Sequence, residues 1–87
     1  MEIIYLRSFY KDLQSIPDTD KKYLKDIILL CKKAEKIEEL PSLKKLKGHS
    51  IAYRIRMGNY RIGIFIEKKH ITFVRIVHRK DIYKQFP

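Results

Sequence analysis

Three arginines in the second half of the chain, Arg54, Arg56 and Arg61, are spaced so that they could hold one anion. Apolar side chains alternate with other residues along two neighbouring segments, which predicts β-strands over residues 51–57 and 60–67. The Gly-Asn pair between them predicts a two-residue hairpin turn, and a turn of that length fixes the strand register. Arg56 is therefore expected directly opposite Arg61 on one face of a β-ribbon.

A pair of arginines in this arrangement has two interpretations. Like charges opposite each other weaken a sheet, and Arg54 is expected close by, across from Gly63, which adds no side chain. A phosphate bound between the guanidinium groups would reverse the sign of the interaction, since their planar forks match phosphate oxygens. The alternative is a solvated strand face that is merely basic, and the local pattern alone does not separate the two.

The distribution of charge along the chain favours an anion site. Residues 1–43 contain eight basic and eight acidic residues, whereas residues 44–87 contain twelve and two, so the second segment carries the whole net charge of +10. Such an asymmetry indicates a polyanionic partner: nucleic acid, an acidic protein segment or a membrane surface. A membrane partner would need a basic amphipathic helix with a free apolar face, and the sequence contains no helix that is free for insertion into a membrane. Nucleic acid is therefore favoured.

The elements that must carry these arginines make up one small α+β domain over residues 1–87. We expect a first strand over residues 2–7, a short helix capped by Ser8, and a longer helix capped by Asp18 or Thr19. The apolar stripes of the two helices predict an αα-hairpin that packs on one face of the sheet.

The remaining segments predict a linker and a last strand. Residues 38–50 are typical of a linker in their Pro, Gly and Ser content, and a strand over residues 70–78 is expected to precede a helical turn at residues 79–83. Alternation in that strand places four side chains on one face: Thr72, Val74, Ile76 and His78. The linker carries four basic groups: Lys44, Lys45, Lys47 and His49. Such a cluster is usually only a solubilising surface, and its functional interpretation is electrostatic capture of phosphates beside a site.

Several kinds of site are disfavoured by what the chain lacks. Three histidines and one cysteine give no zinc spacing, and Cys31, on the apolar face of the longer helix, is expected to be a buried, inert thiol. Glu67 and Asp81 are the only acids in the basic half, which argues against a carboxylate pair or a metal-dependent nuclease. We expect no metal, no cofactor and chemistry that depends on Arg, Lys, His and Tyr. Without a signal peptide or an apolar run of about 18–20 residues, a cytoplasmic protein is expected.

Three motifs resemble the RelE/ParE family of bacterial toxin–antitoxin toxins: KKLKGH at Lys44–His49, YRIRMGNYRI at Tyr53–Ile62 and VRIVHRKDIY at Val74–Tyr83. The resemblance covers essentially the whole chain, and the two later motifs together are fairly specific. It implies the small RelE-like fold, in the order β-α-α-β-β-β, with a twisted, mainly antiparallel sheet, an αα-hairpin and a short C-terminal helical turn.

For the RelE branch, the resemblance implies a metal-free endoribonuclease that cuts messenger RNA in the ribosomal A site. The 2′-hydroxyl of the RNA attacks the adjacent phosphate and leaves a 2′,3′-cyclic product. The family's functional positions fall on Arg54 and Arg56 in the basic strand, Arg61 for the transition state, His78 or Arg79 for a C-terminal basic group, and Tyr83 for base stacking. Some RelE toxins carry lysine at the first two positions, and one such lysine is a proposed general base. Arginine stays protonated, so the general base is expected to be His78 or His49, or else proton removal follows a weaker route.

Two other functions stay open. The resemblance to the ParE branch implies a protein that poisons DNA gyrase by binding it, although the HRKDIY tail argues against a branch that typically lacks the nuclease groups. The same basic patch could also serve a non-catalytic module that binds RNA or the ribosome. Any toxin interpretation implies an antitoxin partner that covers or distorts the basic face with acidic and apolar residues.

Overall fold

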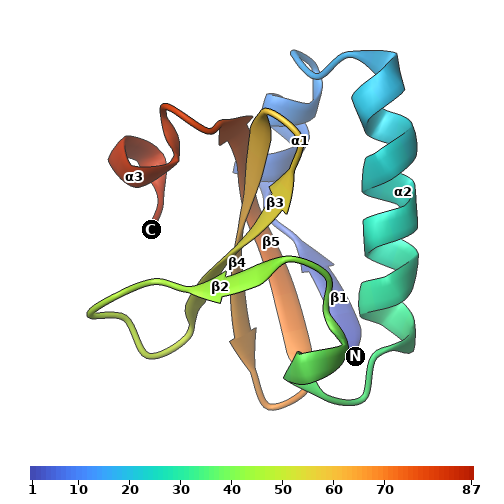
Figure 1. Cartoon of the computed structure of the whole chain (residues 1–87), viewed down its shortest axis with the longest axis vertical. Helices are drawn as coiled ribbons and strands as arrows, with labels where there is room; N and C mark the ends of the chain where they lie inside the picture. The colour runs from blue at the N-terminus through green and yellow to red at the C-terminus, as the bar shows by residue number, and fades with distance from the viewer.

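A single five-stranded sheet separates two helical layers in the computed structural model, which describes all 87 residues (Figure 1). The helices are α1 (Arg7–Leu13), α2 (Asp18–Lys33) and α3 (Ile82–Gln85), and a 3₁₀ turn spans Ile37–Glu39. The strands are β1 (Glu2–Tyr5), β2 (Leu43–Lys45), β3 (Ala52–Met57), β4 (Tyr60–Glu67) and β5 (His70–His78). They are ordered β1-β5-β4-β3-β2, and every neighbouring pair is antiparallel except β1 and β5. The predicted α+β class and mainly antiparallel sheet are confirmed.

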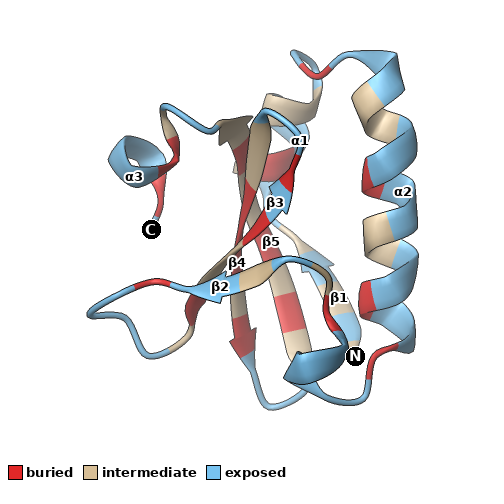
Figure 2. Cartoon of the chain, viewed as in Figure 1, coloured by how far each residue is buried: buried red, intermediate tan, exposed pale blue.

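The sheet has an inner face, covered by α1 and α2, and an outer face, on which α3 packs. In Figure 1 the sheet is seen between α2 on the right and α3 on the left. Alternation on β3 and β4 sends Ile55 and Ile62 to the inner face, where both are fully buried with Phe73 of β5 in a cluster of fourteen apolar residues. This cluster is the main core, because it joins the sheet to the stripe of α2 that contains Leu24 and Cys31 (Figure 2).

A second, smaller cluster lies on the outer face. It consists of four buried residues: Leu46, Ala52, Ile82 and Phe86. Phe65, Val74 and Val77 pack against it from the sheet. The cluster attaches the C-terminal segment to the outer face, so the short helix α3 depends on tertiary packing rather than on its own four residues.

A β-bulge in β5 overturns the predicted alternation of that strand. Gly63 lies opposite Arg75, whereas the next residue of β4 lies opposite Phe73, so Val74 is an extra residue in the ladder. Val74 packs on the outer cluster, whereas Ile76 belongs to the inner one. The prediction that Thr72, Val74, Ile76 and His78 share a face is therefore wrong.

Several element boundaries also differ from the predictions: β1 ends at Tyr5 rather than at residue 7, and α3 spans Ile82–Gln85 rather than residues 79–83. Helix α1 begins at Arg7, and the Ser8 hydroxyl donates to the carbonyl oxygen of Val74 instead of capping the helix. Asp18 is the first residue of α2, with Pro17 at the cap position. The segment 38–50 is not only a linker, because it contains β2 at the edge of the sheet.

No helix combines the length and the apolar character that crossing a membrane requires.

Candidate functional site

The β3–β4 hairpin has the register that the sequence predicts. Arg56 lies opposite Arg61, and Arg54 lies opposite Gly63. Gly58 has φ +58°, a left-handed conformation that suits glycine at the first central position of a two-residue hairpin turn. Since Ile62 on β4 points to the inner face, its neighbour Arg61 points to the outer face. Arg56, which pairs with Arg61, and Arg54, which pairs with Gly63, point to the outer face as well.

Four guanidinium groups gather on the outer face; we call Arg54, Arg56, Arg61 and Arg79 the arginine cluster. Partial burial lowers the pKa of Arg61, and the positive charges of the other three members lower it further. The Arg61 Nη1 donates to the carbonyl oxygens of Gly58 at 2.8 Å and Tyr60 at 2.9 Å, which fixes this side chain beside the turn. None of the three ion pairs of the structure includes a member of the cluster. The cluster is thus a positive site held in place without a carboxylate.

Tyr83 of α3 borders the arginine cluster. The Cζ of Arg54 lies 5.7 Å from the centre of the Tyr83 ring, and Tyr83 stays 65% exposed. The Arg54 Nε is shielded from solvent and has no hydrogen-bond partner. An aromatic face is therefore available to a ligand beside a guanidinium that still has unused donors.

The outer cluster positions Tyr83, and its central contact was not foreseen from the sequence. The Phe86 ring lies directly over Gly63, so a Cβ at that residue would come within 2.5 Å of the ring. The Phe86 and Phe65 ring centres are 5.4 Å apart, and Ile82 is buried beside them. Glycine inside a strand is a signal of close approach by another group, and here that group is the C-terminal segment.

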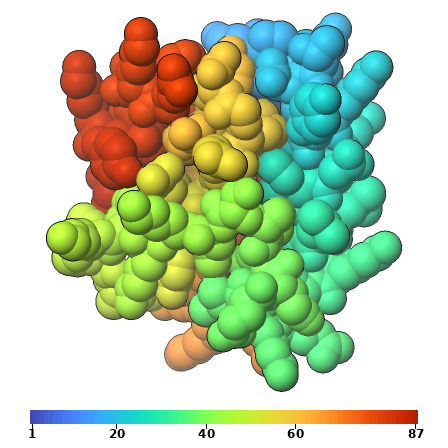
Figure 3. Space-filling view, in the orientation of Figure 1, coloured from blue at the N-terminus to red at the C-terminus, as the bar shows by residue number.

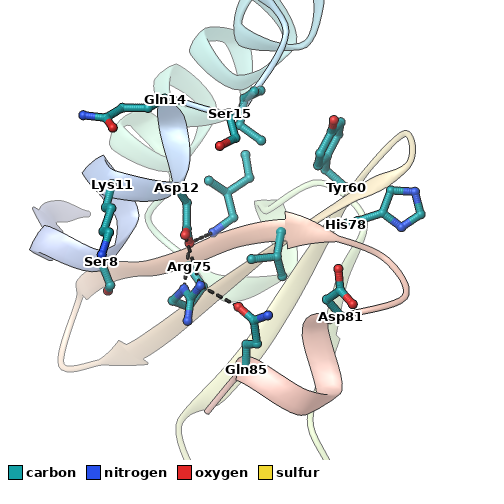
Figure 4. A pocket seen from close by; sticks show the side chains of 13 residues that line it. Ser8, Lys11, Asp12, Gln14, Ser15, Tyr60, Arg75, His78, Asp81 and Gln85 are labelled. Carbon is teal, nitrogen blue, oxygen red and sulfur yellow. Dashed lines mark hydrogen bonds and ion pairs between the residues drawn. The ribbon is translucent and has the colours of Figure 1, made fainter.

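A second support for α3 comes from Arg75, which bridges α1 and α3 and lies in the part of β5 that extends beyond its pairing with β1 (Figure 4). Its Nε and Nη2 donate to the Asp12 carboxylate at 2.7 and 3.0 Å, and its Nη2 also donates to Gln85 at 2.6 Å. The hydrogen bond to Asp12 raises the pKa of Arg75. The same carboxylate accepts a bond of 3.0 Å from the Ile76 backbone N–H. Arg75 and Asp12 are 63 residues apart in the chain, and no local sequence pattern predicts a contact over that separation.

His78 lies away from the arginine cluster. It pairs with Tyr60, which packs on the inner core, and the two rings meet edge to face with centres 6.0 Å apart. Its Nδ1 accepts a hydrogen bond of 3.2 Å from the Lys80 backbone N–H. Tyr60 and His78 line a cavity of about 700 Å³ beside α1, and Figure 4 shows both rings at its rim. Because Tyr60, the residue paired with His78, faces the inner core, His78 lies on the opposite face of the sheet from Arg61.

The basic residues of segment 38–50 lie at three different places in the structure. Lys44 lies opposite Arg54 and so extends the basic outer face, whereas Lys45 lies opposite Tyr53, which packs on the inner core. Lys47 and His49 follow β2 in the turn before β3. They line a cavity of about 200 Å³ together with Tyr83 and three apolar residues: Leu46, Phe86 and Pro87.

Two further expectations concern cysteine and metal. Cys31 is fully buried in the inner core, as predicted, and burial raises its pKa to about 11, which disfavours the reactive thiolate at neutral pH. No three His, Cys, Asp or Glu side chains lie close enough together to hold a metal ion.

The fold is that of a known class of protein. Residues 3–83 match the family model described as the ParE toxin of type II toxin–antitoxin systems, parDE. The chain therefore belongs to the RelE/ParE family of toxin–antitoxin toxins.

Individual relatives carry the name RelE. Toxin RelE3 of Methanocaldococcus jannaschii is 42% identical, and the alignment covers the whole of both chains. A chain in the crystal structure of the RelB–RelE antitoxin–toxin complex from Methanococcus jannaschii is 40% identical, with a TM-score of 0.83 over 97% of this chain and 99% of that one. The isolated E. coli RelE toxin shares the fold alone, at 15% identity, with a TM-score of 0.67 over 97% of this chain and 92% of that one.

Proposed function

We propose that this chain is the toxin of a type II toxin–antitoxin system and a ribosome-dependent endoribonuclease that cuts messenger RNA. The observation that carries the proposal is the arginine cluster: positive side chains without carboxylate partners, in which Arg61 is hydrogen-bonded to the turn and Arg54 lies beside the exposed Tyr83. Such a site matches a phosphodiester with a neighbouring base. The membership of the RelE/ParE family supports the same function.

The arginines would act on the charge that develops at phosphorus. Attack by the 2′-hydroxyl places an additional negative charge on the equatorial phosphate oxygens, and Arg56 and Arg61 would stabilise it across the hairpin, with Arg54 and Arg79 beside them. A single preorganised donor of this kind contributes about 10²–10³ in rate. The repulsion among the guanidinium groups falls when the phosphate binds, so binding is favoured further.

Tyr83 would stack on a base next to the cleaved bond. Base stacking on an aromatic side chain contributes about 1–3 kcal/mol of binding energy. The Phe86 contact on Gly63 and the bond from Arg75 to Gln85 hold α3 in place, so the ring is already oriented before RNA arrives.

Proton transfer requires a group other than arginine. His49 shares a cavity with Tyr83 on the same side as the arginine cluster, whereas His78 lies beside Tyr60 on the other face. We therefore favour His49 over His78 as the acceptor of the 2′-hydroxyl proton. Lys44, opposite Arg54, and Lys47 would bind flanking phosphates.

The proposal includes two partners and a location. RelE chains of M. jannaschii and Pyrococcus horikoshii were crystallised with RelB antitoxins, which supports a cognate antitoxin for this chain. The messenger RNA on the ribosome would be the substrate, so the protein would act in the cytoplasm.

The test compares two arginine variants on purified ribosomes programmed with a defined messenger RNA. Arg61→Ala is expected to reduce cleavage by about 10²–10³. Arg7→Ala, which removes an exposed arginine of α1, is the matched control and should cleave like wild type. Equal cleavage by the two variants, or intact RNA with the wild type, would contradict the proposal.

The second candidate function is a non-catalytic module that binds the ribosome. It is favoured by the composition of the arginine cluster, because arginine does not accept protons and the cluster therefore contains no general base. Wild-type protein that binds ribosomes and leaves RNA whole would favour it. The ParE name of the family model keeps gyrase inhibition as a third reading, to be checked by a supercoiling assay.

A further inference from the structure

The cavity of about 700 Å³ beside α1 lies outside the proposed nuclease site. Strand β1 ends at Tyr5, opposite Phe73, so the last part of β5 has β4 on one side and this cavity on the other. Figure 4 shows the cavity between α1 and the segment that leads into α3. In Figure 3 the C-terminal segment (red) and the N-terminal helices (blue to cyan) lie on either side of the β3–β4 hairpin (yellow) at this end of the molecule. The edge of the sheet is therefore open to a ligand here.

Two backbone groups at this edge of β5 have no protein partner. The Ile76 N–H donates to the Asp12 carboxylate at 3.0 Å, which shows that the backbone groups of Ile76 point away from β4. In an antiparallel ladder the N–H and C=O of one residue point to the same side, and the residue two positions further on repeats that direction. The Ile76 carbonyl and the His78 N–H therefore point along the open edge, and neither takes part in a turn, loop or cap hydrogen bond. They offer one acceptor beside one donor.

The side chains around this pair of groups form two walls, one on each face of the sheet. Ile16 and His78 line the cavity on the side of the inner face, whereas Arg75 and Val77 line it on the side of the outer face. Because the acceptor and the donor lie at the sheet edge between these walls, a flat ligand fits there best. Imidazole and guanidinium groups are both platforms on which a nucleobase stacks.

The charged groups of the cavity give such a ligand an orientation. Lys11 is exposed on α1, and neither Lys11 nor Asp81 takes part in an ion pair, whereas the charge of Arg75 is matched by Asp12. Figure 4 shows Lys11 and Asp81 on opposite sides of the cavity. Lys11 can bind a phosphate, and the Asp81 carboxylate can accept hydrogen bonds from ribose hydroxyl groups. The net charge of +10 also favours an anionic ligand.

We propose that this cavity binds a nucleotide whose base extends the sheet at the open edge of β5. Each of the four RNA bases carries a donor next to an acceptor on its pairing edge, and these would bond to the Ile76 carbonyl and the His78 N–H. A peptide strand fits less well, because the edge ends after this pair: the His78 carbonyl already accepts the Asp81 N–H at 2.8 Å. No member of the arginine cluster lines the cavity, so the inference does not rest on the proposed function.

Hydrogen exchange at one amide gives the direct test. In the free protein the His78 N–H has no partner and should exchange fast, whereas the neighbouring Val77 N–H points to β4 and should be protected. The 5′-monophosphates of adenosine, guanosine, cytidine and uridine are added one at a time at saturating concentration. At least one of them should slow exchange at His78 by about tenfold or more and leave Val77 unchanged. An unchanged rate at His78 with all four would overturn the proposal.

Two lysine variants separate binding in the cavity from general attraction to a positive protein. Lys11→Glu should weaken nucleotide binding by at least about threefold, measured by titration followed with NMR. Lys25→Glu makes the same charge change on an exposed residue of α2 outside the cavity and should weaken it less than about twofold. Equal effects of the two variants would contradict the proposal.

A histidine pair tests the stacking wall. His78→Ala should weaken binding by at least about fivefold, because it removes a ring on which the base stacks. His70→Ala, at the other end of β5, is the control and should bind like wild type. The midpoint of thermal unfolding verifies folding, and the lysine pair decides the matter if His78→Ala does not fold. Equal affinities of the two histidine variants would count against the site.

The arginine cluster also attracts phosphates, so the exchange measurement is repeated in Arg61→Ala. The monophosphate should still slow exchange at His78, and loss of that protection would overturn the proposal. An RNA tetranucleotide then distinguishes two sources of the ligand. Binding at least about tenfold tighter than the monophosphate would assign the site to a nucleotide within an RNA chain, whereas equal affinities would assign it to a free nucleotide. Either result supports a nucleotide site at this edge of the sheet.

Discussion

The two faces of the sheet differ in what their side chains do for the protein. The inner face contributes to a cluster of fourteen buried apolar residues, whereas the outer face has a cluster of four buried residues beside a group of arginines. Burial of apolar surface is the dominant favourable term in folding, whereas like charges close together destabilise the folded state. The comparison indicates that stability comes mainly from the inner face, so that the outer face can hold mutually repelling groups.

The comparison is tested most strongly by truncating one phenylalanine on each face. Phe73 is fully buried in the inner cluster, and Phe65 is only partly buried against the outer one. Phe73→Ala should lower the free energy of unfolding by about 3–5 kcal/mol, measured by urea denaturation. Phe65→Ala should lower it by clearly less, and an equal loss would mean that the two faces contribute alike.

An intermediate effect is expected where the outer face receives the C-terminal segment. Gly63→Ala forces the Phe86 ring to move, because the new Cβ would lie 2.5 Å from it, and we expect a loss of about 1–3 kcal/mol together with reduced RNA cleavage. The control is Gly63→Ala combined with Phe86→Ala. If the steric account is right, the loss in the double variant is smaller than the sum of the two single losses.

The smallest effect has the opposite sign. Arg56→Thr removes one member of the cross-strand pair with Arg61 and should raise the free energy of unfolding by about 0.2–1 kcal/mol, while cleavage falls. Salt screens exposed charges, so the gain should shrink at about 1 M salt. A variant that is less stable than wild type at low salt would show that the arginine cluster is not strained by its own charge.

The hairpin was predictable from the sequence because a two-residue turn leaves only one register. Arg56 and Arg61 therefore lie opposite each other as predicted. Strand β2 was missed because it has three residues in a segment rich in Lys, Pro and Gly, and pairing with β3 overrides that composition.

The position of His78 was not predictable from alternation, because the bulge at Val74 changes the phase of β5. The spacing of Ile71, Phe73 and Ile76, which changes from two residues to three, is a signal of the bulge. Val74 and Val77 hide that signal, since they are apolar as well. The contact of Phe86 with Gly63 depends on how the chain returns to the outer face, which no local pattern specifies.

The bulge and the glycine compensate each other in volume. At this level of the sheet, β5 contributes two residues, Val74 and Arg75, where β4 contributes Gly63, a residue without a side chain. Val74 fills space beside the C-terminal segment, and Arg75 is left over to reach Asp12 and Gln85. The additional residue in β5 and the missing side chain at Gly63 in β4 thus allow Arg75 to link α1 and α3, near the two ends of the chain, to the middle of the sheet.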